Sequence, residues 1–144
     1  MKVMALDYGR ARTGVAVSDP TGAVARPLGV VENVNDQDGL EKLLHVIRIE
    51  EPERIVVGLP LLMSGERGVA AESAQQFADA LSARTELPVD TYDERLTSAL
   101  SERRLRELGV RTGHARARVD QGAAVALLES YLLRLQSRSR GPGA

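Results

Sequence analysis

Residues 3–18 read VMALDYGRARTGVAVS, and the fold follows from this stretch. A short apolar run ends in Asp7, a turn containing Gly9 follows, and a second apolar run comes after it. The pattern predicts a hairpin of two strands, over residues 2–6 and 13–18, with a carboxylate directly after the first strand. An acid in that position destabilises a protein unless water, a hydrogen bond or a cation meets it. Asp7 is therefore a candidate site residue.

Apolar spacing along the rest of the chain predicts three more strands and four helices. The strands are expected over 27–34, 54–57 and 89–92, and the helices from the Asn35-Asp36 cap to Pro52, across Ala70–Leu81, and over about 97–108 and 119–135. The later strands alternate with helices, which requires parallel crossovers. The predicted fold class is α/β, a mixed five-stranded sheet with helices on both faces, and ligands of such sheets gather at the carboxyl ends of strands.

The composition fits one globular domain. The chain has 144 residues, of which 43% are hydrophobic, so it can bury a proper core. The domain is expected over residues 1–136, and Ser137–Ala144 is expected to be a disordered tail rich in Gly, Pro, Ser and Arg. No apolar run approaches the ~18 residues of a membrane span, and the run before Asp7 is too short for a signal peptide. These features predict a cytoplasmic protein that does not enter the membrane.

The residue types limit the chemistry. The chain has no cysteine, which excludes disulfides, thiolate zinc sites and thiol catalysis. Its two histidines, His45 and His114, argue against a multi-histidine metal site. Any metal ion would be held by oxygen atoms, which favours Mg²⁺ or Mn²⁺ over zinc.

The net charge of −1 does not indicate nucleic-acid binding, but the distribution of the charges along the chain is more informative. Arginines gather in one segment: Arg95, Arg103, Arg104, Arg106, Arg111, Arg116 and Arg118. Lysine occurs only at positions 2 and 42, and arginine grips phosphate bidentately where lysine cannot. The alternative is a compositional bias towards arginine on a solvated helix face.

Three acids stand out by position. Asp7 and Glu94 follow the first and fifth expected strands. In a parallel arrangement with the first strand between the fourth and the fifth, the carboxyl ends of these two strands share one rim. Asp120 lies in the first turn of the last helix, on the same stripe as Leu127 and Tyr131, which faces the protein.

Each acid also has a simpler interpretation. Asp7 could cap its own turn, Glu94 could belong to an exposed Glu–Arg pair, and Asp120 could interact with the helix dipole. Three carboxylates on one rim would repel one another and raise one another's pKa values, and divalent cations remove that conflict. Such a cluster with one or two Mg²⁺ ions is the machinery of phosphodiester hydrolysis.

The chain resembles the YqgF family, also called RuvX, whose members are RNase H-like proteins described as Holliday junction resolvases or pre-16S rRNA nucleases. Four segments carry the resemblance, in family order and spacing, across residues 2 to about 135. They are Leu6–Gly9 with Gly14–Asp19, Ile55–Leu61 with Met63 and Gly65, Asp93–Thr97, and Val119-Asp120 with Ala123–Tyr131. The chain departs from the family at Leu62, a position that is often Asn in the family. This difference affects any substrate contact made from the loop that carries Leu62.

The resemblance implies an RNase H-like fold and a Mg²⁺- or Mn²⁺-dependent nuclease with one or two ions. It implies that Asp7, Glu94 and Asp120 are the catalytic acids and the metal ligands. The implied activity is hydrolysis of structured nucleic acid, in 5′-end processing of pre-16S rRNA during ribosome biogenesis or in Holliday junction resolution during DNA recombination.

Substrate contacts are expected from residues around these acids. Gly9 would let the backbone approach a phosphate closely, and the other candidates are Arg10, Arg12, Arg95, Arg103, Arg104, Arg106 and Arg118. Aromatic residues make up only 3% of the chain, so recognition by shape is favoured over base stacking.

Two other functions remain open from the sequence. One is a non-catalytic nucleic-acid-binding factor in ribosome assembly or transcription, which keeps the acids without turnover. The other is an actin-like ATPase or sugar kinase, because Asp7-Tyr8-Gly9 with Gly14 resembles a first phosphate loop, although the second domain of those proteins is missing here. The choice between DNA and RNA, the cleavage mode, the metal used and the choice between monomer and homodimer also remain open, since a junction resolvase must make two symmetric cuts.

Overall fold

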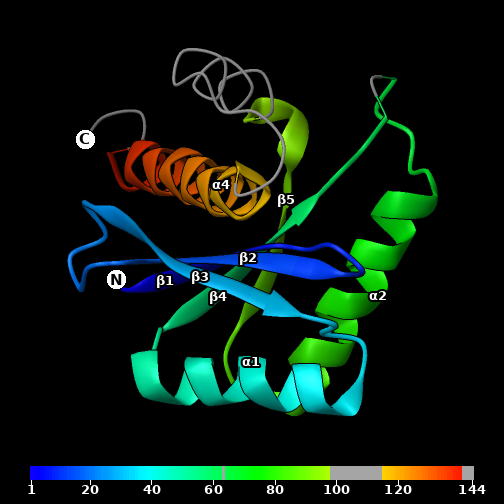
Figure 1. Cartoon of the computed structure of the whole chain (residues 1–144). Coiled ribbons are helices and arrows are strands. Elements are labelled where there is room, and N and C mark those ends of the chain that lie inside the picture. Colours follow the sequence, from blue (N-terminus) through cyan, green and yellow to red (C-terminus); the bar gives the residue numbers. More distant parts are fainter. Residues whose placement is uncertain (63, 98–114, 141–144) are drawn as a thin grey trace.

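A computed structural model gives the structure of the chain (Figure 1), and it describes residues 1–62, 64–97 and 115–140, without the side chains of 115–121 and 138–140. The elements in chain order are β1 (Val3–Asp7), β2 (Arg12–Ser18), β3 (Ala25–Glu32), α1 (Gln37–Glu50), β4 (Arg54–Leu59), α2 (Val69–Arg84), β5 (Val89–Asp93), the 3₁₀ turn η1 (Glu94–Leu96) and α4 (Ala115–Arg140). The helix expected over 97–108 lies outside the described residues, apart from Thr97. Among the helices of the described part, none is long and apolar enough to cross a membrane.

The five strands form one mixed sheet in the order β3-β2-β1-β4-β5. The first three strands are antiparallel neighbours, whereas β4 pairs parallel with both β1 and β5. This confirms the predicted fold class. The expected order of the parallel strands was wrong, because β4, and not β1, lies in the middle of the three. One strand therefore separates the end of β1 from the end of β5.

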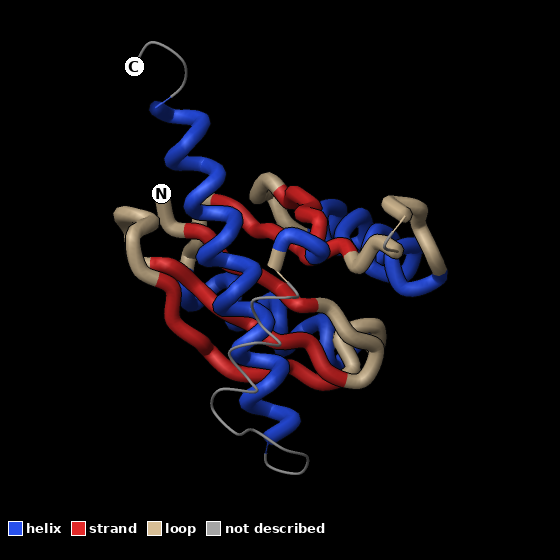
Figure 2. Tube along the Cα trace, turned by 90° about the horizontal axis from the view of Figure 1, so that it is seen from above, coloured by secondary structure: helices blue, strands red, loops and turns tan. Residues whose placement is uncertain are grey.

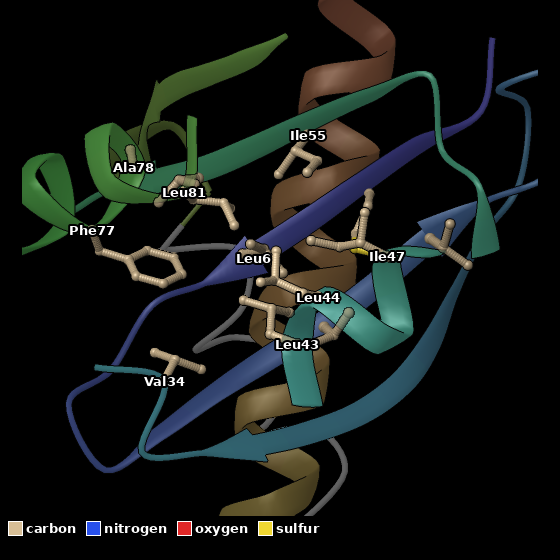
Figure 3. Packing of buried hydrophobic residues seen from close by; sticks show 13 residues of the cluster. Leu6, Val34, Leu43, Leu44, Ile47, Ile55, Phe77, Ala78 and Leu81 are labelled. Atoms are coloured by element: carbon tan, nitrogen blue, oxygen red, sulfur yellow. The ribbon is translucent and has the colours of Figure 1, made fainter. Parts of the chain in front are cut away.

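Helices cover both faces of the sheet, with α1 and α2 on one face and α4 on the other (Figures 1 and 2). The central strand β1 is buried on both sides, and its side chains alternate between the two cores. Met4 and Leu6 pack with α1 and α2, whereas Val3 and Ala5 pack against α4. Figure 3 shows the first core, where leucines of α1 and Phe77 of α2 converge on the sheet.

Several expected boundaries shift. β3 occupies Ala25–Glu32 rather than 27–34, and it accommodates Pro27 because it is an edge strand. β4 continues to Leu59, two residues beyond its expected end.

The last helix is longer than predicted at both ends. It runs from Ala115 to Arg140, so residues 137–140, which were expected in a disordered tail, are helical. Gly141 and Pro142, which disfavour helix, come only after Arg140, and that is the reason for the difference. Residues 141–144 of the expected tail lie outside the described part of the chain.

Candidate active site

Asp7 is the last residue of β1 and pairs with Gly14 of β2 across the hairpin. The turn that follows it is held by Thr13, which is fully buried. The Thr13 hydroxyl donates a hydrogen bond to the carbonyl oxygen of Gly9 (3.2 Å) and accepts one from its N–H (3.4 Å). A Cβ on Gly9 would collide with the carbonyl group of Arg12. The turn that carries Asp7 therefore requires glycine at position 9 for its own geometry, before any substrate is considered.

Tyr8 fixes the other side of the same turn. Its ring stacks on Phe77 of α2, with ring centroids 4.7 Å apart, and its hydroxyl accepts a hydrogen bond from the side-chain amide of Asn35 (2.6 Å). The residue next to Asp7 is thus held against α2 and against the segment that leads into α1.

Glu94 is the first residue after β5, and its side chain lies over β4 at Gly58. A Cβ on Gly58 would lie only 2.9 Å from Cγ of Glu94 and 3.0 Å from its Cδ. Because Gly58 has no side chain, the carboxyl group of Glu94 crosses β4 and hydrogen-bonds to Asp7. Gly58 was not expected to be a functional residue, although it belongs to the segment Ile55–Leu61 that carries part of the family resemblance.

The electrostatics of this carboxyl pair are unfavourable without a proton or a cation. Burial raises the pKa of Glu94 to about 9, with further contributions from the hydrogen bond to Asp7 and from the negative charges of Asp7 and Asp93. In the absence of metal, Glu94 is therefore protonated at neutral pH and donates its hydrogen bond to Asp7. A divalent cation between the two groups would replace that proton and satisfy both sets of oxygens.

In a chelating buffer, the wild-type protein should lose stability relative to Glu94→Gln as the pH rises. The folded protein holds a proton on Glu94 that the unfolded chain releases, so this contribution is complete below a pH of about 4.5 and is lost as the pH approaches about 9. Glutamine has no proton to lose, so thermal melting of the two proteins should show a difference that widens with pH. A difference that stays constant would mean that Glu94 is not buried against Asp7.

The third acid, Asp120, falls in the first part of α4, but its side chain is not among those described. One helical turn later, Ala124 is fully buried against the sheet, followed by Leu127 and Leu128. Within the described side chains, which do not include that of Asp120, no three acidic, histidine or cysteine residues form a group that could hold a metal ion. Asp7 and Glu94, two of the three expected ligands, thus lie together, and the role of all three acids as metal ligands stays a prediction.

The available donors suit a hard cation. They are carboxylate oxygens at the carboxyl ends of β1 and β5, and one of them is a buried group that is neutral unless a cation is present. Mg²⁺ and Mn²⁺ prefer such oxygen ligands.

The expected phosphate-binding arginines differ in their surroundings. Arg10 is exposed and Arg12 is half-buried, both within five residues of Asp7 along the hairpin. Arg95 instead makes a bidentate ion pair with Asp93, with Nη2 2.7 Å from Oδ2 and Nε 3.1 Å from Oδ1. This pair lowers the pKa of Asp93 and occupies part of the guanidinium that was expected to meet a phosphate. The remaining candidates lie outside the described side chains: Arg103, Arg104, Arg106 and Arg118.

The loop that carries Leu62 runs beside Arg95. Within it, the N–H of Gly65 donates to the carbonyl of Leu62 (2.8 Å), and a Cβ on Gly65 would lie 3.5 Å from Nη1 of Arg95. The Leu62 side chain is 51% exposed. Leu62 therefore presents an apolar surface beside the site, at a position where the family that the chain resembles often has Asn.

Solved structures share this fold. The chain is similar to Thermus thermophilus RuvC in complex with a Holliday junction substrate, with a TM-score of 0.63 and 17% identity over 94% of this chain and 96% of that chain. It is also similar to the fowlpox virus resolvase in complex with Holliday junction DNA, with a TM-score of 0.59 and 11% identity over 95% of this chain and 100% of that chain. At these identities the likeness concerns the fold, which is the RNase H fold of RuvC-like resolvases.

The chain belongs to the family described as "RuvX: Holliday junction resolvase", whose model matches residues 1–134. A protein of Chloroflexus aurantiacus is 42% identical over 130 residues, which cover 90% of this chain and 85% of that protein. A protein of Anaeromyxobacter is 41% identical over 132 residues, covering 92% of this chain and 96% of that one. Both carry the name "Putative pre-16S rRNA nuclease". The family expected from the four sequence segments is thereby confirmed.

Proposed function

We propose that this chain is a divalent-metal-dependent nuclease that hydrolyses phosphodiester bonds in structured nucleic acid, with the precursor of 16S rRNA as the favoured substrate. Membership of a resolvase and nuclease family supports the reaction class. The observation that carries the proposal is the contact between the carboxyl groups of Asp7 and Glu94 across Gly58. A fold needs no buried carboxyl pair of this kind for stability, because the pair destabilises the ionised form of Glu94.

In the proposed mechanism, Asp7, Glu94 and Asp120 hold one or two Mg²⁺ or Mn²⁺ ions. The ions would lower the pKa of the attacking water and stabilise the leaving oxygen. Asp7 is positioned by the Thr13–Gly9 turn and by the stacking of Tyr8 on Phe77, and Glu94 is positioned by the open space at Gly58. Arg10 and Arg12, on the hairpin that leads out of β1, would contact phosphates on either side of the cleaved bond.

The choice of RNA as substrate rests on the relatives of this chain, whose names refer to pre-16S rRNA and which align with nine-tenths of it. A four-way DNA junction is the second candidate, because both solved structures named above are complexes with Holliday junctions.

A side-by-side cleavage assay tests the proposal. The substrates are a pre-16S rRNA fragment, an unstructured RNA and a four-way DNA junction, each with Mg²⁺, with Mn²⁺ and with a chelator, and with Asp7→Asn as the blank. Metal-dependent cleavage of the rRNA precursor by wild type, absent in the blank, supports the proposal. Binding without cleavage under every condition would contradict it and would support the non-catalytic alternative.

Arg10→Ala should weaken nucleic-acid binding to a similar extent for all sequences. The loss of one phosphate contact reduces the slope of log affinity against log salt by about 0.7 for single strands and about 0.9 for duplex DNA. Fluorescence anisotropy over a salt series measures that slope. Arg48→Ala is a matched control, because Arg48 is an exposed arginine in the last turn of α1, away from the hairpin. Equal slopes for the two variants would remove Arg10 from the substrate surface.

A further inference from the structure

Arg95 lies beside the carboxyl pair, but its charge is already compensated by a neighbour. Its Nε and Nη2 atoms lie 3.0 Å and 2.7 Å from Oδ2 of Asp93, and its backbone N–H donates to Oδ1 of the same carboxylate (2.9 Å). A bidentate pair of this kind fixes the plane of the guanidinium and leaves it little net charge for a phosphate. Asp93 therefore makes Arg95 a fixed, planar group at the end of β5.

The loop between β4 and α2 holds the guanidinium from a second side. A Cβ on Gly65 would lie 3.5 Å from Nη1 and 3.8 Å from Nη2 of Arg95, so the backbone of this loop runs close beside the group. Two backbone hydrogen bonds close the loop, from the N–H of Gly65 to the carbonyl of Leu62 (2.8 Å) and from the N–H of Leu62 to the carbonyl of Glu66 (2.9 Å). Arg95 thus connects the end of β5 with the loop that follows β4, at one edge of the sheet (Figure 1).

The guanidinium and its apolar neighbours are accessible from solvent. The side chain of Arg95 is 37% exposed although it is paired, and the side chain of Leu62 is half exposed. Val69, the first residue of α2, is 87% exposed, and it directly follows Gly68, against which the Leu62 side chain lies. A single exposed apolar side chain is ordinary on a protein surface. Here two of them belong to the segment that runs beside a fixed planar cation.

The turn η1 places this cation at a constant offset from the carboxyl pair. Glu94, which hydrogen-bonds to Asp7, directly precedes Arg95 in the turn. Thr97 closes the turn, because its N–H (2.9 Å) and its hydroxyl group (3.0 Å) both donate to the carbonyl of Glu94, and its side chain is buried. A strand with one phosphate at the carboxyl pair therefore brings a neighbouring nucleotide to Arg95.

We propose that Arg95 is the platform of a nucleobase-binding subsite: an unpaired base of an RNA substrate stacks on its guanidinium, with Leu62 at the edge of the stack. This inference rests on the proposed function, in which the phosphate to be cleaved lies at the carboxyl pair, and it adds that the nucleotide beside that phosphate is unpaired. Guanidinium planes accept the unstacked bases of single-stranded RNA as aromatic rings do. Aromatic residues make up only 3% of this chain, so an arginine takes the place of an aromatic platform.

The subsite favours one kind of substrate. A base inside a continuous duplex is already stacked on both sides and cannot reach the guanidinium without leaving its partner. An unpaired segment of an RNA precursor offers such a base at no cost of unpairing, whereas a fully paired four-way junction does not. Stacking also tolerates any base, so the subsite selects for strandedness and not for sequence.

An abasic scan combined with Arg95→Lys tests the subsite. The probe is a labelled RNA hairpin with an unpaired tail that lacks one base at a time, and fluorescence anisotropy in a chelating buffer measures its affinity without metal-dependent cleavage. For wild type, removal of one particular base of the tail should lower affinity about tenfold. Lysine keeps the positive charge but has no planar surface. Arg95→Lys should therefore bind the intact RNA about tenfold more weakly, and removal of the same base should cost nothing further.

Arg84→Lys is the matched control. Arg84 also pairs with a carboxylate, that of Glu41 at 2.7 Å, but it lies in the last turn of α2, at the far end of that helix from the loop beside Arg95. This variant should bind every probe like wild type. The subsite is overturned if wild type does not bind the RNA, if no single base matters, if Arg95→Lys binds the intact RNA like wild type, or if the base matters equally in both proteins.

The outcome for the subsite is separate from the outcome for the proposed function. The affinities are measured without metal, so they do not depend on cleavage. A base shared with Arg95 in the binding assay, together with no cleavage under any metal condition, would overturn the catalytic proposal and leave the subsite to an RNA-binding protein. Metal-dependent cleavage without that shared base would overturn only the subsite.

Discussion

Asp7→Asn should abolish metal-dependent cleavage, with a loss of about a thousandfold or more, which corresponds to about 4 kcal/mol of transition-state stabilisation. The asparagine keeps the size of the side chain and one oxygen, but it removes the negative charge that attracts a divalent cation. Asp7 is also the group that Glu94 contacts, so this one change alters both described members of the carboxyl pair.

The same substitution should not destabilise the protein in a chelating buffer. The negative charge of Asp7 raises the pKa of Glu94, and without that charge the ionised form of Glu94 costs less free energy in the folded state. A loss of cleavage with an unchanged or higher melting temperature would separate a functional effect from unfolding.

Asp79→Asn provides the matched control for Asp7→Asn. Asp79 is an exposed residue of α2 whose carboxylate accepts a hydrogen bond from Gln75 (3.0 Å), so the same chemical change occurs away from the candidate site. It should leave cleavage and Mn²⁺ affinity at wild-type levels. An Asp7→Asn protein that cleaves within about tenfold of wild type would mean that the reaction does not depend on this carboxylate.

The layered fold could be predicted from the sequence because its signals are local. The hairpin of residues 3–18, the amphipathic spacing of α1 and the proline and glycine breaks each depend on residues close together in the chain. Asp36 takes the N-cap position of α1 as expected, although its side chain makes no capping hydrogen bond, and Leu43, Leu44 and Ile47 are buried on the inner face of the helix.

The order of the parallel strands, in contrast, could not be predicted from local signals. Nothing in the hydrophobic pattern of β4 or β5 states which of them lies beside β1, since both are short apolar runs between helices. For that reason the sequence could predict only that Asp7 and Glu94 lie on the same rim of the sheet, and not that their carboxyl groups meet. The role of Gly58 follows from the observed order, because only a strand placed between the two acids can block their contact.

The pairing of side chains is a second feature that could not be predicted from the sequence. Arg95 was expected to face a phosphate, but η1 brings it back onto Asp93, whose carboxylate accepts hydrogen bonds from both the backbone N–H and the guanidinium of Arg95. Residues two apart on a strand would share a face without folding back in this way, so the pairing depends on a local turn that the sequence pattern did not resolve.

Gly58→Ala should reduce metal-dependent cleavage by about a hundredfold while leaving the fold intact. The added methyl group would lie 2.9 Å from Cγ and 3.0 Å from Cδ of Glu94, so the Glu94 side chain must move. A displacement of about 1 Å at a catalytic group is enough to cost about two orders of magnitude in rate. The backbone of β4 has no reason to change, because alanine is less costly than glycine in a strand interior.

The readouts for Gly58→Ala are the cleavage rate, the Mn²⁺ dissociation constant and the melting temperature, compared with Gly68→Ala. Gly68 precedes α2, and a Cβ there would make ordinary contact with the Leu62 side chain at 3.4 Å, so its substitution should change none of the three strongly. For Gly58→Ala we expect weaker Mn²⁺ binding and slow cleavage with an equal or higher melting temperature. Wild-type cleavage by Gly58→Ala would mean that Glu94 acts from another position than the one it occupies over β4, and that the crossing at Gly58 is not what assembles the site.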